Sequence, residues 1–427
     1  MRGARALGAA PRGVESFAVF FVAAAAYVLA GRQLVVHQHV VSSGTLGSLG
    51  RALMVWRDRP GKLAAIGFTP PPLPTVALLP AAAATSLVTT LKALPLTAAP
   101  LAAAALVLID RLLARCGLPL PLRLALVVAV AFNPLWVLAA TAEPPAALEL
   151  ALLALALYGL VSWLIARGPR HLLLAGAAFA LLGLTNYVGF AVALAAAVLV
   201  GARLWASRAT ADEIEGSLLG FAAAPVYAIT AWIVLGAAIA GSPFGWLHDI
   251  RGEGLGPLHG GALALVLVAL AAAAWLFRAA SPGLRPAVAL GTAALVVGAL
   301  AGAWSAMQRA SAAPVERAFV AAVRTGRDQR ADAPERAIAA AIRAAAPGDG
   351  RILADEAHCA GVIALTGRPA LFVTRAAHGD RAWRAIAAHP QGRVSMVLVA
   401  TRAPLPPGSD VVASAPGYAL LRVPASG

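Results

Sequence analysis

Charged residues are scarce in this sequence: they make up 12% of 427 residues, whereas a soluble domain carries about a quarter. The apolar share is 60%, and the few charges are unevenly placed. Long apolar blocks fill the chain from Ser16 to Met307, whereas the remainder has the composition of an ordinary soluble protein. This distribution excludes a wholly soluble protein. It predicts a transmembrane part over residues 1–307 and a soluble domain over residues 308–427.

Cysteine is also scarce, and the apolar blocks lack the period-2 alternation of membrane strands. Cys116 and Cys359 are expected on opposite sides of the bilayer, so no disulfide framework is predicted. Runs of about 20 apolar residues can cross ~30 Å of hydrocarbon, and they must be helical because lipid offers backbone groups no partners. Without alternation, a barrel is excluded. The sequence therefore predicts a polytopic α-helical membrane protein with about nine to ten transmembrane helices.

Acidic residues are few, at 19 against 34 basic ones, which gives a formal net charge of +15. Nucleic-acid binding is excluded because the basic residues lie mainly at the ends of apolar segments rather than on one clustered face. They orient the chain instead, since Lys/Arg-rich loops stay cytoplasmic. The predicted crossings are residues 16–36, 94–114, 124–140, 146–166, 171–186, 187–205, 217–240, 259–277 and 287–306. We expect a multi-pass protein of the cytoplasmic membrane, with a cytoplasmic N-terminus and an extracytoplasmic C-terminal domain.

Two stretches on the outer side interrupt this pattern. Residues 75–91 are apolar, but the prolines around them predict a broken or re-entrant segment rather than a full crossing. In the first outer loop, residues 37–74, the leucines Leu46, Leu49 and Leu53 follow helical spacing. This pattern predicts an amphipathic helix over 46–62 in the membrane interface. Its cations, which either grip a lipid phosphate or snorkel to head groups, are Arg51, Arg57, Arg59 and Lys62.

The tail from Gln308 alternates helix-like and strand-like runs. Helices are expected over Glu335–Ala346 and Asp380–Ala388. The strand-like runs are Arg351–Ala354, Leu371–Thr374, Val394–Ala400 and Tyr418–Val423. This mixture predicts a small α/β domain.

Several short motifs follow one another along nearly the whole chain. They are Ile66-Gly67-Phe68-Thr69-Pro70-Pro71-Pro72-Leu73, Phe132-Asn133-Pro134 with Glu143 beyond it, Leu184-Thr185-Asn186-Tyr187, and Leu365-Thr366-Gly367-Arg368-Pro369. In this order they resemble the GT-C superfamily of membrane glycosyltransferases. The closest type is the polyprenyl-phosphate-sugar-dependent group, which includes protein mannosyltransferase-like and actinobacterial arabinosyltransferase-like enzymes.

The resemblance implies transfer of a sugar from a polyprenyl-phosphate donor to an acceptor hydroxyl at the outer membrane face, with inversion. In such enzymes an acid at the start of the first outer loop takes the acceptor's proton, and cations offset charge on the leaving phosphate. The implied partners are membrane lipid, the lipid-linked sugar and an acceptor that the sequence does not identify. No cofactor is implied.

The match departs from the family pattern at three charged positions. Directly after the first helix, residues 37–44 contain no Asp or Glu. Asn186 stands where an Arg is expected, and Val188 stands where a second acid is expected. Two classes therefore stay open: an active transferase, or a non-catalytic relative that acts as a membrane scaffold or binds a lipid carrier. A secondary transporter is a weaker third interpretation, because no inverted repeat is visible.

The acid that could replace the missing base is Glu143, in a tight outer turn, or less favourably Asp58. The alternative for Glu143 is a loop carboxylate stabilised by a helix N-terminus, and for Asp58 a surface ion pair. The resemblance adds Asn186 and Tyr187 to the cations above as substrate-binding residues. His37 and His39 lack a Cys or acidic cluster beside them, so no metal site is predicted.

Overall fold

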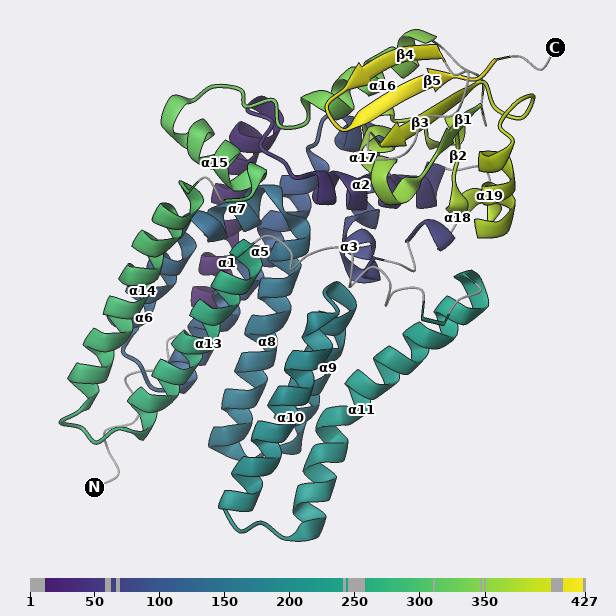
Figure 1. Cartoon of the computed structure of the whole chain (residues 1–427). Helices are drawn as coiled ribbons and strands as arrows, with labels where there is room; N and C mark the ends of the chain where they lie inside the picture. The colour runs from purple at the N-terminus through teal and green to yellow at the C-terminus, as the bar shows by residue number, and fades with distance from the viewer. Residues whose placement is uncertain are drawn as a thin grey trace.

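The computed structural model describes residues 12–57, 63–66, 70–240, 243–244, 258–309, 312–345, 348, 351–400 and 410–424. Long helices form a bundle, and a smaller unit with a sheet sits on one end of it (Figure 1). The bundle helices are α1 (Arg12–Gly31), α5 (Ala93–Arg115), α6 (Leu120–Ala131), α7 (Pro134–Ala142), α8 (Pro144–Ala166), α9 (Pro169–Thr185), α10 (Val188–Ala206), α11 (Ala211–Leu235), α13 (Leu258–Ala279) and α14 (Arg285–Met307).

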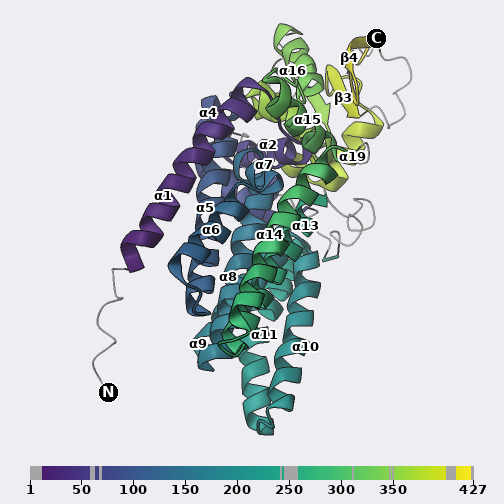
Figure 2. The ribbon, with the colours of Figure 1, turned by 90° about the vertical axis from the view of Figure 1, so that its left-hand side faces the viewer.

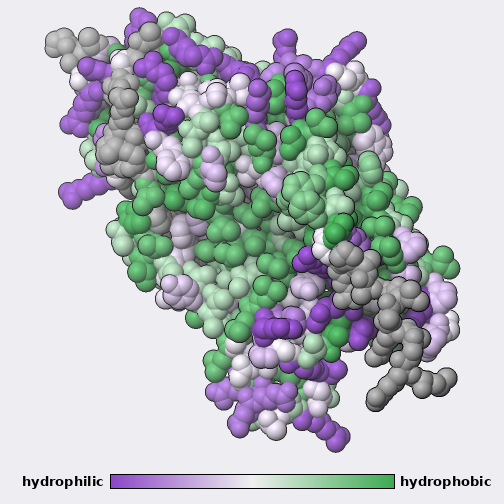
Figure 3. Space-filling model, turned by 180° about the vertical axis from the view of Figure 1, so that it is seen from behind, coloured by the Kyte–Doolittle hydropathy of each residue, from purple (hydrophilic) through white to green (hydrophobic). Residues whose placement is uncertain are grey.

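The bundle confirms a polytopic helical membrane protein. Within the described residues, seven helices are long and apolar enough to cross a membrane, or eight if the bent pair α6–α7 forms one span. The helix α9 is apolar but has only 17 residues. Figure 3 shows an apolar band between two hydrophilic ends, as expected for a protein surrounded by lipid. The helix α1 runs along the bundle, and its last residues lie at the end that carries the C-terminal unit (Figure 2).

The crossing predicted at 124–140 is bent. The chain bends by 65° between α6 and α7. Pro134 has no backbone N–H to continue the helix, and the Asn133 side chain instead accepts a hydrogen bond of 3.0 Å from the Leu135 N–H. A helix therefore ends at Ala131, and a new one starts at Pro134.

The segment after the first outer loop is broken, as predicted. It forms α3 (Pro72–Ala82) and the short α4 (Thr85–Thr89), and neither is long enough to cross a membrane. Leu91, with a φ of 60°, lies at the turn into α5. The prediction of a broken or re-entrant segment is confirmed.

The expected amphipathic helix is present as α2 (Ser43–Arg57), but it does not lie against lipid through its leucines. Leu46, Leu49 and Leu53 are fully buried in the protein. The helix lies across the end of the bundle, between α3 below and the C-terminal unit above (Figure 1). The interfacial interpretation is therefore corrected: the apolar face was read as lipid-facing, whereas the C-terminal unit covers it. Residues 58–62 lie outside the described residues.

The C-terminal unit is built on a small sheet. Its strands are β1 (Ile352–Ala354), β2 (Phe372–Val373), β3 (Met396–Ala400), β4 (Asp410–Ala415) and β5 (Tyr418–Arg422), in the order β2-β1-β3-β5-β4. The first three strands are parallel, and β5 runs antiparallel to both β3 and β4. The helices are α15 (Pro314–Thr325), α16 (Ala333–Ala345), α17 (Glu356–Thr366), α18 (Arg375–His378) and α19 (Asp380–Ala388). Four of these strands were predicted from the sequence, and β4 was not.

The C-terminal unit docks on the bundle through α17, which crosses α2 at very close range. A Cβ atom added to Gly50 of α2 would overlap the backbone carbonyl of Ala360. On the other side of the crossing, a Cβ added to Gly361 would lie 3.1 Å from the Cβ of Leu46. The two helices therefore meet through their backbones, and this contact fixes the C-terminal unit over the segment where α2 begins.

Candidate functional site

Glu143 lies in the turn between α7 and α8, with Pro144 at the first position of α8. Its carboxylate accepts hydrogen bonds from the Ser42 N–H at 3.2 Å, from the Ser42 hydroxyl at 3.0 Å and from the Thr45 hydroxyl. Only 4% of the residue is exposed. A buried carboxylate is tolerated where hydrogen-bond donors surround it, as they do here.

The donors come from the N-terminus of α2. The Ser42 hydroxyl accepts a hydrogen bond of 3.2 Å from the Thr45 N–H, and its carbonyl accepts one of 3.0 Å from the Leu46 N–H, which makes Ser42 the N-cap. The carboxylate of Glu143 thus lies at the positive end of the α2 dipole. This contact joins two segments that are 101 residues apart in the sequence.

The position of Glu143 matters because residues 37–44 contain no acidic residue of their own. Ser42 belongs to this segment, and the carboxylate of Glu143 is bonded directly to it. An acidic group therefore does occupy the start of the first outer loop, although it comes from another turn of the chain. Its burial means that residues 42–45 must shift before any ligand can reach it.

A second acid reaches the same segment from the C-terminal unit, and no pattern in the sequence pointed to it. The Nδ1 atom of His39 lies 2.8 Å from a carboxylate oxygen of Asp328. The backbone supports the contact, because the Gln329 N–H donates to the Gln38 carbonyl at 2.9 Å. Partial burial raises the pKa of Asp328, but the hydrogen bonds from His39 and the Arg330 N–H outweigh it, so the pKa lies below its ordinary value.

Two of the predicted phosphate-binding cations can be placed, and both reach toward α3 and the chain after it. The Arg51 guanidinium donates to the Ser48 hydroxyl at 3.0 Å and to the Thr75 hydroxyl at 3.5 Å. Arg57, which is exposed, donates to the Ala83 carbonyl at 3.1 Å. Asp58, Arg59 and Lys62 lie outside the described residues.

Asn186 and Tyr187 occupy the turn between α9 and α10. The Asn186 side chain accepts a hydrogen bond of 3.1 Å from the Val188 N–H, which caps α10. The Tyr187 hydroxyl accepts one of 3.2 Å from the indole N–H of Trp232 on α11. These contacts position helices. The helix α3 packs against both α2 and α9.

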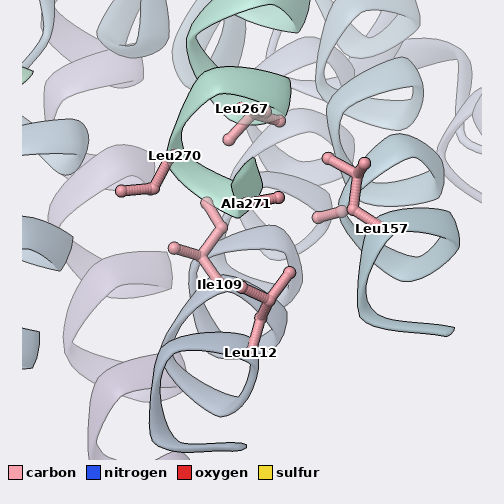
Figure 4. A pocket seen from close by; sticks show the side chains of 7 residues that line it. Ile109, Leu112, Leu157, Leu267, Leu270 and Ala271 are labelled. Carbon is pink, nitrogen blue, oxygen red and sulfur yellow. The ribbon is translucent and has the colours of Figure 1, made fainter. Parts of the chain in front are cut away.

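One cavity lies inside the bundle and has no polar lining. Ile109 and Leu112 of α5, Leu157 of α8, and Leu267 of α13 point into it, among other apolar side chains (Figure 4). Its volume is about 10 Å³, which is barely one water molecule. This cavity is a packing gap and cannot hold a substrate.

Comparisons with protein-family models, with curated proteins and with solved structures found no match.

Proposed function

We propose that this chain is a GT-C-like membrane glycosyltransferase, which transfers a sugar from a polyprenyl-phosphate donor at the end of the bundle that carries the C-terminal unit. The observation that supports this most directly is the contact between Glu143 and Ser42. It puts a carboxylate at the start of the first outer loop, where the resemblance implies the base. The remaining support is the ordered series of motifs along the chain.

In this proposal, Glu143 takes the proton of the acceptor hydroxyl. The acceptor oxygen forms a bond to the anomeric carbon as the bond between that carbon and the donor phosphate oxygen breaks. The electron pair of the broken bond leaves with the lipid phosphate, whose negative charge Arg51 and Arg57 offset from α2. Opening of the α2 N-terminus exposes the carboxylate when the acceptor binds.

The experiment that tests the proposal measures sugar transfer from a radiolabelled polyprenyl-phosphate donor in membranes that contain the chain. We expect transfer by the wild type. The variant Arg51→Ala should retain the fold but bind the donor roughly 10- to 100-fold more weakly, because a charge-assisted contact to phosphate is worth about 1.5–3 kcal/mol. The matched control is Arg324→Ala on α15, since that cation stacks over Trp304 instead. Equal donor affinity in all three proteins contradicts the placement of the donor on α2.

We further propose that the end with the C-terminal unit faces away from the cytoplasm. The opposite end carries basic turns, such as Arg167 with Arg170 and Arg203 with Arg208, which are retained in the cytoplasm. A reporter that works only outside the cytoplasm should therefore be active when it is fused after residue 427. A reporter that works only in the cytoplasm should be active when it is fused in the α10–α11 turn. The reverse pair of activities would contradict this orientation.

A second candidate function is a non-catalytic relative that binds a lipid carrier. One observation favours it: the Glu143 carboxylate is buried and bonded to Ser42 and Thr45, as a structural tie between α2 and α8 would be. In this case the wild type binds the radiolabelled donor and releases no sugar to any acceptor.

A further inference from the structure

A basic pocket lies at the end of the bundle opposite the C-terminal unit. It has a volume of about 380 Å³ and is lined by Cys116, Gly117, Phe277, Arg278 and Arg285. Cys116 and Gly117 follow the last turn of α5, Phe277 and Arg278 belong to the last turn of α13, and Arg285 begins α14. Three apolar helices thus end or begin around it, which puts the pocket at the level of lipid head groups.

Within the part of the chain that the structure describes, no acid offsets the charges of the two arginines of this pocket. Arg278 donates to the Arg115 carbonyl at 3.5 Å, and the Arg285 guanidinium lies over the Phe277 ring at 5.9 Å. Among the described residues, neither guanidinium pairs with a carboxylate. Arg123 at the same end differs, because it is bonded to Glu15 and lies 2.6 Å from Asp110.

The local field is positive. Burial raises the pKa of the Cys116 thiol to about 11, while the charges of Arg278 and Arg115 act in the opposite direction. The positive field and the open cavity together suit an anion rather than a neutral ligand.

We propose that this pocket binds the phosphate of an anionic phospholipid. Two guanidinium groups can form forked contacts to phosphate oxygens, and basic pockets between membrane helices are typical sites for such head groups. Leu276 and Leu284, which are exposed and adjoin the lining residues Phe277 and Arg285 in the sequence, offer an apolar surface to the acyl chains. The internal cavity between α5, α8 and α13 is too small to admit a chain, so the chains lie outside the bundle.

The test is native mass spectrometry of the purified full chain in detergent, titrated with phosphatidylglycerol, phosphatidylcholine or inorganic phosphate. We expect one phosphatidylglycerol to bind, with phosphatidylcholine and inorganic phosphate each at least tenfold weaker. The double variant Arg278→Gln, Arg285→Gln should weaken phosphatidylglycerol binding about thirtyfold, because each arginine contributes about 1 kcal/mol and 1.4 kcal/mol is a factor of ten.

The matched control is the double variant Arg203→Gln, Arg208→Gln, which removes two exposed arginines from the same end of the bundle. It should bind phosphatidylglycerol as the wild type does. The variant Arg285→Lys keeps the charge but loses the fork, so it should bind phosphatidylglycerol more weakly than the wild type does. This comparison holds even if the pocket double variant fails to fold. If both double variants lose the same affinity for phosphatidylglycerol, the lipid is held by general electrostatic attraction to this end of the protein. If inorganic phosphate binds as tightly as phosphatidylglycerol, the pocket is not a lipid site. Either result overturns the proposal.

Discussion

Replacing Glu143 with glutamine is expected to lower sugar transfer by a factor of about 10²–10⁴, which is the usual contribution of a general base. The variant removes the charge that accepts the proton of the acceptor hydroxyl, while it retains the shape of the side chain. Donor binding should not change, because the donor phosphate is held by cations on α2 in this proposal. The measurement is transfer from the radiolabelled donor, with donor binding measured in the same membranes.

The burial of Glu143 makes a control for stability necessary. In Glu143→Gln the amide oxygen can still accept from the Ser42 N–H, so thermal unfolding in detergent should change little. In Glu143→Ala the donors of Ser42 and Thr45 lose their acceptor, which should cost roughly 1–3 kcal/mol of stability. Transfer by Glu143→Gln at the wild-type rate would exclude the base role. A drop in transfer that follows the loss of stability in both variants would identify Glu143 as a structural tie alone.

Much of the bundle could be predicted from the sequence because its signals are local. Each membrane helix is a long apolar run. The break in the 75–91 segment was predicted from the prolines around it, but Pro80 lies inside α3, and the chain breaks after it, at Ala83 and Ala84. The helix α2 could be predicted from leucines at helical spacing, but what covers them could not. Lipid and a protein domain both favour the same apolar face, so the pattern cannot distinguish them.

In the C-terminal unit, one helix was predicted from the sequence and another was missed. The helix α16 has its buried residues Ile338, Ala339 and Ile342 on one face, and it was predicted. The helix α17 was missed because the stretch from Cys359 to Thr366 is buried all round, between the sheet and α2. A helix that is apolar on every side carries no periodic signal.

The candidate site depends on contacts that no local pattern encodes. Glu143 meets Ser42 across 101 residues, and Asp328 meets His39 across 289. The sequence singled out Glu143 through its place in a motif, but its enclosure by the N-terminus of α2 appears only in the fold. Asp328 had no motif around it, so nothing in the sequence pointed to it. Contacts of this kind arise when separate helices pack, which is why residue types and spacing did not predict them.

The variant Gly50→Ala should release the C-terminal unit from the bundle, because the new methyl group would overlap the carbonyl of Ala360. At this crossing the backbones of α2 and α17 are in contact, so no flexible side chain can move aside. We therefore expect the protein to lose about 1–3 kcal/mol of stability, as an overpacked core does. The measurement is hydrogen exchange of the amides of α2 and α17, together with thermal unfolding in detergent.

The matched control is Gly47→Ala, one turn earlier on the same helix. A Cβ atom there meets only the Nη1 atom of Arg51, at an ordinary 3.5 Å. Since alanine favours a helix over glycine by about 1 kcal/mol, this variant should be as stable as the wild type or more so. The two substitutions are chemically identical, but their surroundings differ, and their effects on stability should therefore be opposite in sign. If Gly50→Ala also stabilises the protein and leaves exchange in α17 unchanged, α17 does not hold the C-terminal unit on α2. The segment that contains Ser42 would then be free to open without moving that unit.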